Sequence, residues 1–386
     1  MRICLVYDCL FPHTVGGLER YLRTVAERLA AEGHEITYLT LRQWDRDGVP
    51  DAPAGTRVVA VGPRMRLYSR GGERRVGPPL MFGAGVLLHL LRHGRRYDVV
   101  HTASFPYFSL LSAALVRPLH RFTLVVDWFE LWSRAYWREY LGPLGGGIGW
   151  GVQALCLRVP QHAFCFARLT ERRLQAEGIR GGVTLLTGLW PGPLEPDGPL
   201  AAEPLVVFAG RHIPEKRAPA VVGAVARASR AIPGLRGRVL GDGPERSAVL
   251  AAISAEDAEG FVEAPGFVGA DAVQADLSRA LCLLLPSKRE GYGLVVVEAC
   301  SHGTPCVLVA DEDNAAAELI EDGVNGVIAA SASSEDLAAA IERVHAAGPT
   351  MRVSTAAWFG ASSARLSLAG TLDTVAETYR DASARS

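Results

Sequence analysis

Short apolar segments alternate with longer segments of helical periodicity along the chain. Strand candidates in its first part are residues 2–7, 35–41, 58–61, 99–101 and 122–126, and in its second part residues 205–209, 238–240, 281–285 and 306–309. The main helix candidates are residues 18–32, 217–229, 244–255, 294–301 and 335–346. Buried strands that alternate with helices are typical of parallel sheets covered on both faces. The pattern predicts an α/β fold of two doubly wound, Rossmann-like domains facing across a cleft.

Residues 190–199 interrupt this alternation, because they contain four prolines and two glycines that can continue neither element type. A new first strand follows at residues 205–209. We therefore predict an N-terminal domain over residues 1–190 and a C-terminal domain over residues 204–365. A last helical pattern begins at residue 366, after an expected break at Trp358–Gly360. Ligands commonly bind between two such domains.

Composition narrows the class of protein. The chain has 386 residues, of which 49% are hydrophobic and 21% charged, and its net charge is −1. These values indicate a globular protein and give no argument for nucleic acid as a partner. Seven scattered cysteines without a CxxC pair favour a reducing compartment. The start of the chain reads as a strand and the apolar run 141–157 contains six glycines, so we expect a cytoplasmic protein.

The loop after the first strand contains Gly16 and Gly17 directly before a helix. Glycine lets the backbone approach a ligand, and the N-terminus of a helix offers N–H donors and partial positive charge to a phosphate. The same pair also suits an ordinary turn, so both interpretations stay open at this point.

The equivalent loop of the second half carries Arg211 and Lys216 between a strand and a helix. Arginine can fork onto two phosphate oxygens, and lysine acts as a compact point charge. The carboxyl end of a parallel strand is where ligands of α/β proteins bind. This position favours a phosphate site over a solvated loop.

A third loop, residues 285–298, places Glu290 and Glu298 eight residues apart around Gly291 and Gly293. Carboxylates at fixed positions can accept hydrogen bonds from sugar hydroxyls, and glycine exposes backbone N–H groups. The alternative is two unrelated surface glutamates, since glutamate is frequent near helix N-termini.

With these loops in place, residues 205–330 resemble the retaining glycosyltransferases of family four, which have the GT-B fold. The matching motifs are Gly210–Arg211 through Lys216, residues 241–245, residues 265–268, the Glu290–Glu298 pair, and residues 298–305 and 322–326, in order and at family spacing. The first half matches only through its first strand and residues 16–20. Acceptor-binding domains of this family are known to diverge.

The resemblance implies a role for each matching residue. Arg211 and Lys216 would grip the donor diphosphate, and Glu298 would bind the ribose. Glu290 would position the transferred sugar. The remaining donor-site residues would act through their backbone: Gly16, Gly17 and Gly241 near the diphosphate, Phe267 and Val268 at the base, and Gly291, Tyr292, Gly293 and Leu294 at the sugar. The final helix, residues 366–386, would return to the N-terminal domain.

The implied reaction is transfer of a sugar from a nucleoside-diphosphate sugar to an acceptor with retention of configuration. The transition state resembles an oxocarbenium ion, so charge grows on the departing diphosphate, and fixed cations and helix N-termini can stabilise it. We expect no metal ion and no cofactor. A sugar-nucleotide epimerase of the same fold, or a catalytically silent relative that binds a partner enzyme, remains the alternative.

The first half departs from the family where many relatives carry a histidine, because residues 123–132 contain none. Asp127 and Glu130 could meet the sugar or acceptor there, with Asp127 as a catalytic residue, or Asp127 could cap the next element. His101 is a fallback, and Phe129 takes the place of the family histidine. Trp128, Phe129 and Trp132, in an aromatic stretch that continues to Tyr140, predict an acceptor wall, with core packing as the alternative.

The segment 64–96 is strongly basic. A solvated loop is the simplest interpretation. The functional interpretation is that the segment contacts an anionic membrane surface or a phosphorylated acceptor.

Overall fold

Two sets of parallel strands organise the chain in the computed structural model, which describes residues 1–14, 16–45, 48–67, 75–195 and 201–384. The first unit comprises Met1–Thr187 and Ala369–Ser386, and the second comprises Gly188–Leu368. The division after Thr187 lies within three residues of the predicted end of the N-terminal domain. Each unit is described by itself below.

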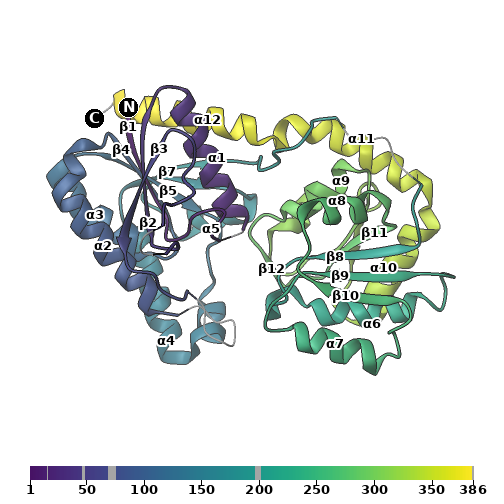
Figure 1. Ribbon diagram of the computed structural model, residues 1–386. Helices are drawn as coiled ribbons and strands as arrows, with labels where there is room; N and C mark the ends of the chain where they lie inside the picture. Colours follow the sequence, from purple (N-terminus) through teal and green to yellow (C-terminus); the bar gives the residue numbers. More distant parts are fainter. Residues whose placement is uncertain (15, 46–47, 68–74, 196–200, 385–386) are drawn as a thin grey trace. The chain divides into compact units, whose positions relative to one another are not determined.

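In the described part of the first unit, seven parallel strands form one sheet in the order β3-β2-β1-β4-β5-β6-β7 (Figure 1). The strands are β1 (Arg2–Val6), β2 (Glu35–Leu41), β3 (Thr56–Gly62), β4 (Val99–Ala103), β5 (Thr123–Trp128), β6 (Gln161–Cys165) and β7 (Gly181–Leu185). The helices are α1 (Gly17–Ala31), α2 (Gly77–His93), η1 (Gly94–Arg96), α3 (Phe108–His120), α4 (Arg134–Leu157), α5 (Arg168–Ala176) and α12 (Leu368–Ala384).

The second unit repeats this plan with a six-stranded parallel sheet in the order β10-β9-β8-β11-β13-β15. Its strands are β8 (Leu205–Ala209), β9 (Arg236–Leu240), β10 (Val262–Gly266), β11 (Cys282–Leu285), β13 (Cys306–Val309) and β15 (Gly326–Ala329), with a short ladder of β12 (Arg289–Glu290) and β14 (Asp313–Asn314). Its helices are η2 (Pro214–Lys216), α6 (Ala218–Ala228), α7 (Arg246–Ala255), α8 (Ala270–Arg279), α9 (Leu294–Ser301), η3 (Ala315–Leu319), α10 (Ser334–Ala347) and α11 (Pro349–Leu366).

The strand order of each sheet reverses at one point. In the first unit β1 pairs with β2 on one side and β4 on the other, and in the second unit β8 pairs with β9 and β11. Ligands of open α/β sheets bind outside the carboxyl ends of the strands at such a reversal. The loops after β1 and β8 are those that carry Gly16, Gly17, Arg211 and Lys216. The fold confirms the predicted two Rossmann-like domains.

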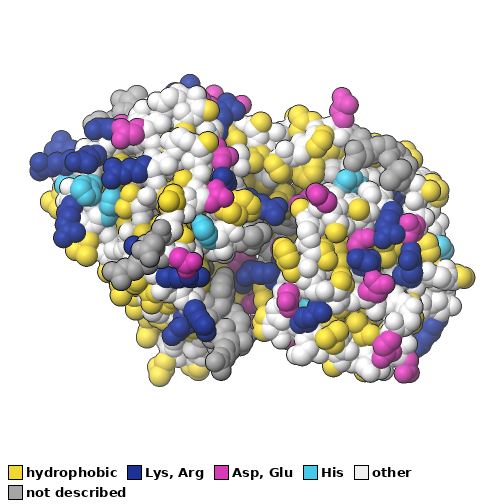
Figure 2. Space-filling view, in the orientation of Figure 1, with side chains coloured by type: hydrophobic (Ala, Val, Ile, Leu, Met, Phe, Trp, Pro, Cys, Tyr) yellow, Lys and Arg dark blue, Asp and Glu magenta, His cyan; other side chains and the backbone are white. Residues whose placement is uncertain are grey.

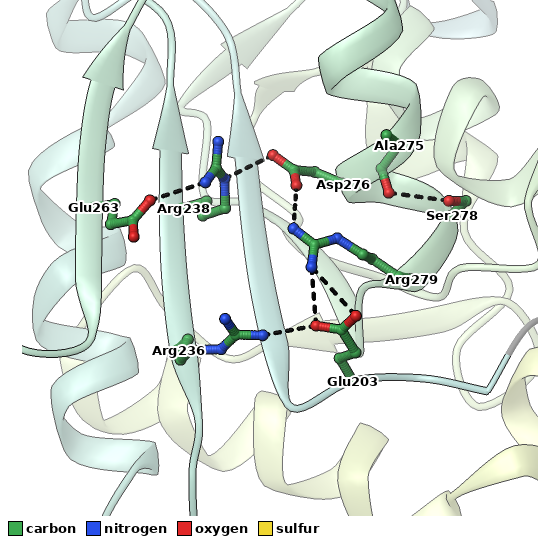
Figure 3. A network of polar contacts seen from close by, with 8 residues as sticks. All are labelled: Glu203, Arg236, Arg238, Glu263, Ala275, Asp276, Ser278 and Arg279. Carbon is green, nitrogen blue, oxygen red and sulfur yellow. Dashed lines mark hydrogen bonds and ion pairs between the residues drawn. The ribbon is translucent and has the colours of Figure 1, made fainter.

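An ion-pair network joins β9 of the second unit to α8 (Figure 3). Asp276, which is 4% exposed, forms ion pairs with Arg238 on β9 and with Arg279 of its own helix, both at 2.7 Å. Glu203 forms ion pairs with Arg279 at 3.0 Å and with Arg236 at 2.6 Å. A nearly buried carboxylate with two guanidinium partners is well compensated. The network fixes the segment that enters β8.

The predicted break at Trp358–Gly360 is wrong. Helix α11 continues through these residues to Leu366, and Phe359 is completely buried, while Gly360 lies on the exposed side where a glycine costs little more than 1 kcal/mol. The break is at Ser367, whose ψ of 131° is not helical. There the Leu368 N–H donates to the Trp190 carbonyl at 2.8 Å.

The apolar run 141–157 forms most of helix α4, which kinks at Gly142 (φ 72°). Leu144 and Ile148, one turn apart, are 86% and 70% exposed. Within the described residues, none of the helices combines the length and apolar character needed to cross a membrane.

Candidate functional site

The loop after β8 holds the two cations predicted for the second unit. Arg211 is exposed, and its guanidinium makes no hydrogen bond or ion pair with a described residue. Lys216 ends the short helix η2, where its N–H donates to the carbonyl of Ile213 at 2.9 Å. The loop therefore presents one unpaired cation and fixes the backbone of the other.

Lys216 and Glu290 are brought together, although they stand 74 residues apart in sequence. The Lys216 ammonium donates to Glu290 Oε1, which also accepts from the Ser287 hydroxyl at 2.9 Å. The side chains are only 18% and 10% exposed. An ion pair this shielded from water has a larger interaction than an exposed one. The loops after β8 and β11 thus form one charged site.

The Glu290 loop is held by a residue that sequence reasoning missed, Asn314. Its side-chain N–H groups donate to the carbonyls of Ser287 at 3.1 Å and Val309 at 2.8 Å, and its Oδ1 accepts from the Ala316 N–H at 3.1 Å. Strand β14, which ends at Asn314, pairs with β12, which ends at Glu290. Three hydrogen bonds from one buried amide fix the register of this ladder. Such a role leaves no motif, because it depends on a contact 24 positions away.

Gly293 begins helix α9 in a left-handed conformation (φ 92°), and a Cβ atom there would lie 2.4 Å from the Ala316 side chain. Only glycine fits this position. The neighbouring Tyr292 is 8% exposed, and burial raises its pKa to about 12. The turn directs the first N–H groups of α9, those of Leu294 and Val295, to the carboxyl edge of the sheet, while the Val296 N–H donates to the Gly293 carbonyl at 2.9 Å. Glu298 lies half-buried one turn further along this helix.

A second close backbone approach occurs at Gly241, directly after β9. Its φ is 124°, and a Cβ atom there would lie 1.9 Å from the carbonyl oxygen of Gly210. Phe267, after β10, is 74% exposed. Val268 beside it is half-buried. The four loops after β8, β9, β10 and β11 all lie at one edge of the sheet, as the predicted donor site requires.

In the first unit, Gly16 precedes helix α1, which begins at Gly17. A Cβ atom at Gly16 would lie 2.3 Å from Glu19 Oε2, so the nearly buried Glu19 carboxylate packs against this glycine. Gly16 is extended (φ −163°), a conformation that any residue adopts, so a larger residue there would only have to displace the end of the Glu19 side chain.

Gln43, which sequence analysis did not identify, ties this loop to the end of β2. Its Oε1 accepts from the Leu10 N–H at 3.2 Å and the Thr14 hydroxyl at 2.6 Å. Its Nε2 lies 3.2 Å from the Thr40 hydroxyl and 3.3 Å from the Asp8 carbonyl. One amide side chain therefore shapes the loop that leads to Gly16.

The structure does not support the prediction that Asp127 and His101 face an acceptor. Both side chains are 0% exposed, and His101 Nε2 lies 3.0 Å from Asp127 Oδ1. His101 Nδ1 bonds the hydroxyl of Tyr379 on α12, and burial, then the Asp127 charge, raises the pKa of Tyr379 well above its usual value. Burial of all three groups removes them from any substrate. We correct their role to fixing the final helix on β4 and β5, which also places that helix in the first unit.

The aromatic residues divide into core and partly exposed members. Trp128 is completely buried and donates to Gln161 at 2.9 Å, so its predicted place in an acceptor wall is wrong. Phe129 is half-buried and stacks on Phe166 at 4.2 Å. Trp132 is also half-buried and donates from its indole to Glu130 at 2.8 Å. Phe129, Glu130 and Trp132 therefore remain able to meet a ligand, as does Tyr140 at the end of the stretch, which is 36% exposed.

Comparisons with known proteins agree with this geometry. The family model "Glycosyltransferase Family 4" matches residues 15–188, and "Glycosyl transferases group 1" matches residues 197–354. A 186-residue segment is 31% identical to alpha-D-kanosaminyltransferase of Streptomyces kanamyceticus and spans 46% of each chain. Glycogen synthase of Mycobacterium tuberculosis is 25% identical over 89% of this chain and 86% of its own.

Solved structures show the same fold. Sucrose-phosphate synthase from Thermosynechococcus elongatus has a TM-score of 0.79 at 18% identity, with each chain covered completely. HepE of Anabaena, solved with UDP and glucose, has a TM-score of 0.73 at 18% identity over 99% of this chain and 100% of its own. The two family models together span nearly the whole chain, and the chain belongs to the family 4 glycosyltransferases, with the GT-B fold.

Proposed function

We propose that this enzyme transfers a sugar from a nucleoside-diphosphate sugar to an acceptor hydroxyl, with retention of configuration and without a metal ion. The second unit would hold the donor and the first the acceptor. The observation that carries the proposal is the shielded Lys216–Glu290 pair beside the unpaired Arg211 at the carboxyl edge of the sheet. HepE, solved with UDP and with UDP-glucose, supports a donor of this class.

In the proposed reaction the bond between the anomeric carbon and the diphosphate oxygen breaks. A new bond forms to the acceptor oxygen on the same face, and the acceptor proton passes to the departing diphosphate. Negative charge grows on that diphosphate in the transition state. Arg211, Lys216 and the N–H groups that begin α9 would stabilise the charge without reorganising. Glu290 would hold the sugar hydroxyls and keep Lys216 in place.

Nucleotide binding tests the donor site. Ligands that bind the folded state raise its melting temperature by mass action, so UDP, GDP, ADP and TDP can be compared by thermal unfolding. We expect one diphosphate to stabilise the protein and Arg211→Ala to remove most of the shift. Arg343→Ala, a 54% exposed arginine of the same unit that pairs with Asp322, is the matched control. Absence of stabilisation by every diphosphate would contradict the proposal.

Turnover measurements test the proposed metal independence and the proposed retention of configuration. Donor consumption by the purified chain, followed in the presence and absence of a chelator, should not depend on the chelator. The anomeric configuration of the product, read by NMR, should equal that of the donor. Inversion, or loss of activity that added divalent metal restores, would remove the corresponding part of the proposal.

We also propose that the first unit docks on an anionic membrane. Leu88, Leu91 and Arg92 share one face of α2, and all three are exposed. Basic side chains gather beside histidine and apolar side chains on one side of the first unit (Figure 2). The exposed arginines 64, 66, 75, 95 and 96 surround that helix in sequence. Residues 68–74 of this basic segment lie outside the described residues. Each basic side chain near an anionic surface contributes about 1 kcal/mol.

Vesicle sedimentation tests this docking. Phosphatidylglycerol vesicles should retain the protein, phosphatidylcholine vesicles should not, and added salt should release it. The double variant Arg92→Glu with Arg96→Glu should lower retention, and Arg343→Glu should not. Equal retention on both lipids would contradict the proposal.

A further inference from the structure

An open pocket of about 630 Å³ lies in the first unit where β2 and β3 end. It is lined by Arg42, Trp44, Asp45 and residues 60–64. Its volume falls in the range of small-molecule sites. The carboxyl ends of parallel strands meet at one edge of the sheet, so the pocket opens at the same edge as the Gly16 loop. None of its lining residues has a role in the donor site or in the aromatic cluster.

The charges of the pocket are not balanced. The exposed Arg64 pairs with Asp45 at 2.5 Å. Arg42 is half-buried, and within the ranges that the structure describes its guanidinium makes no hydrogen bond or ion pair. Two guanidinium groups and one carboxylate leave one net positive charge. A partly desolvated cation without a partner is costly unless an anion approaches it. Arginine prefers the two oxygens of a phosphate or carboxylate.

Trp44 supplies a flat apolar wall beside that charge. Its indole is half-buried, and its ring centre lies 5.9 Å from that of His13 at an angle of 40°. The contact holds the indole on the loop after β1. Large aromatic faces pack against the apolar faces of ring-shaped ligands. An arginine and an indole two residues apart therefore suit a ring that carries an anionic group.

The backbone beneath both side chains is fixed. The Arg42 N–H donates to the Gly62 carbonyl at 3.2 Å, which joins the ends of the two strands. Gln43, between Arg42 and Trp44, is anchored by the hydrogen bonds to Leu10 and Thr14 described above. A site whose backbone is preorganised loses less free energy on binding.

We propose that this pocket binds the acceptor through an anionic ring, a sugar that carries a phosphate or a carboxylate. Arg42 would bind the anionic group and Trp44 the ring. The inference rests on the proposed function, because it names the acceptor class of that reaction. It concerns the first unit alone, whereas the donor site lies in the second.

Calorimetric titration of the full chain tests the pocket. The probes are glucose 6-phosphate and glucuronate, with glucose as the neutral ring and inorganic phosphate as the anion without a ring. We expect at least one anionic sugar to bind roughly tenfold more tightly than glucose, and Arg42→Gln to remove that advantage. Arg42→Lys, which keeps the charge but not the fork, should lose part of it. Trp44→Leu should weaken the sugar and leave inorganic phosphate unchanged.

Arg158→Gln, at an exposed arginine of the same unit outside the pocket, is the matched control and should bind as the unaltered chain does. UDP titration of every variant separates this proposal from the donor site and shows that each variant is folded. If anionic sugars bind no better than glucose, or if Arg42→Gln binds them equally well, the pocket proposal is overturned while the donor site stands. If the chain binds anionic sugars through Arg42 but binds no nucleoside diphosphate, the result supports the pocket proposal and contradicts the proposed donor.

Discussion

The two units share one fold, but they build their loops differently. In the second unit, glycine backbones shape the site: Gly241 and Gly293 have φ values of 124° and 92° and meet neighbouring atoms closely. In the first, side-chain amides do this work: Gln43 holds the loop before Gly16, and Gln153 of α4 accepts a hydrogen bond from the Tyr107 hydroxyl at 3.0 Å. A backbone that only glycine can adopt leaves a readable motif. A hydrogen-bonded side chain leaves none, so the loops of the first half offer fewer motifs to a direct reading of the sequence.

The largest effect should follow from breaking the charged pair of the second unit. Glu290→Gln keeps the size of the side chain but removes the charge that holds Lys216, and turnover should fall by roughly 100- to 1,000-fold, as for other preorganised electrostatic contacts. Steady-state donor consumption measures it.

Glu335→Gln, which alters a 60% exposed glutamate paired with Arg227, is the matched control and should leave turnover unchanged. UDP binding to Glu290→Gln should survive, since Arg211 remains. If Glu290→Gln were fully active, Glu290 would not position the sugar or Lys216 for the reaction. The charged pair would then not distinguish the second unit from the first.

In the first unit, the corresponding test removes Asp127. Asp127→Ala leaves the buried His101 and Tyr379 without their carboxylate, and the unit should lose about 3–5 kcal/mol of unfolding free energy. Denaturant unfolding followed by UDP binding separates the units, because the donor site should keep its affinity below the transition.

The double variant Asp127→Ala with His101→Ala should cost less than the sum of the single variants, because the two groups are partners. An Asp127→Asn chain of normal stability but without turnover would instead assign Asp127 a catalytic role and reverse our correction.

Gln43 offers a smaller test of the same contrast. Gln43→Ala leaves the Leu10 N–H and the Thr14 hydroxyl without their acceptor, which should cost about 1–3 kcal/mol and loosen the loop before Gly16. The KM for the donor should rise more than kcat falls. Gln175→Ala, an exposed glutamine of α5, is the control. Unchanged stability and KM would show that the loop holds its shape without this amide.

Sequence reasoning reached the motif-bearing loops of the second unit but missed its strands β10 and β15 and its helix α8. It reached the first unit only in outline. Strands 205–209 and 306–309 and helix 294–301 were predicted with their observed bounds. The sequence placed Lys216 and Glu290 on two loops of one site, but the ion pair between them appears only in the structure. Trp128 and Asp127 were placed wrongly, because a strand that is buried on both faces gives no sign of which polar side chains have partners across the sheet. Asn314 and Gln43 act over distances that periodicity does not reveal.

The smallest expected effect is the pH dependence that His89 adds to the stability of the first unit. Burial, then the charges of His93, Arg57 and Arg96, lowers the pKa of His89 from 6.5 to about 4. The unfolded chain therefore takes up a proton first as the pH falls, so the stability that neutral His89 contributes is complete above pH 6.5 and declines toward pH 4. Between pH 7.5 and 5.5 the loss should be about 1 kcal/mol.

His89→Gln, which can keep the hydrogen bond to Tyr97, should make the unfolding free energy less dependent on pH over this interval. The control is His345→Gln, at an exposed histidine of the second unit, which should leave the pH dependence unchanged. If the His89→Gln slope equals that of the unaltered chain, the acid sensitivity lies elsewhere and the two units do not differ in this respect.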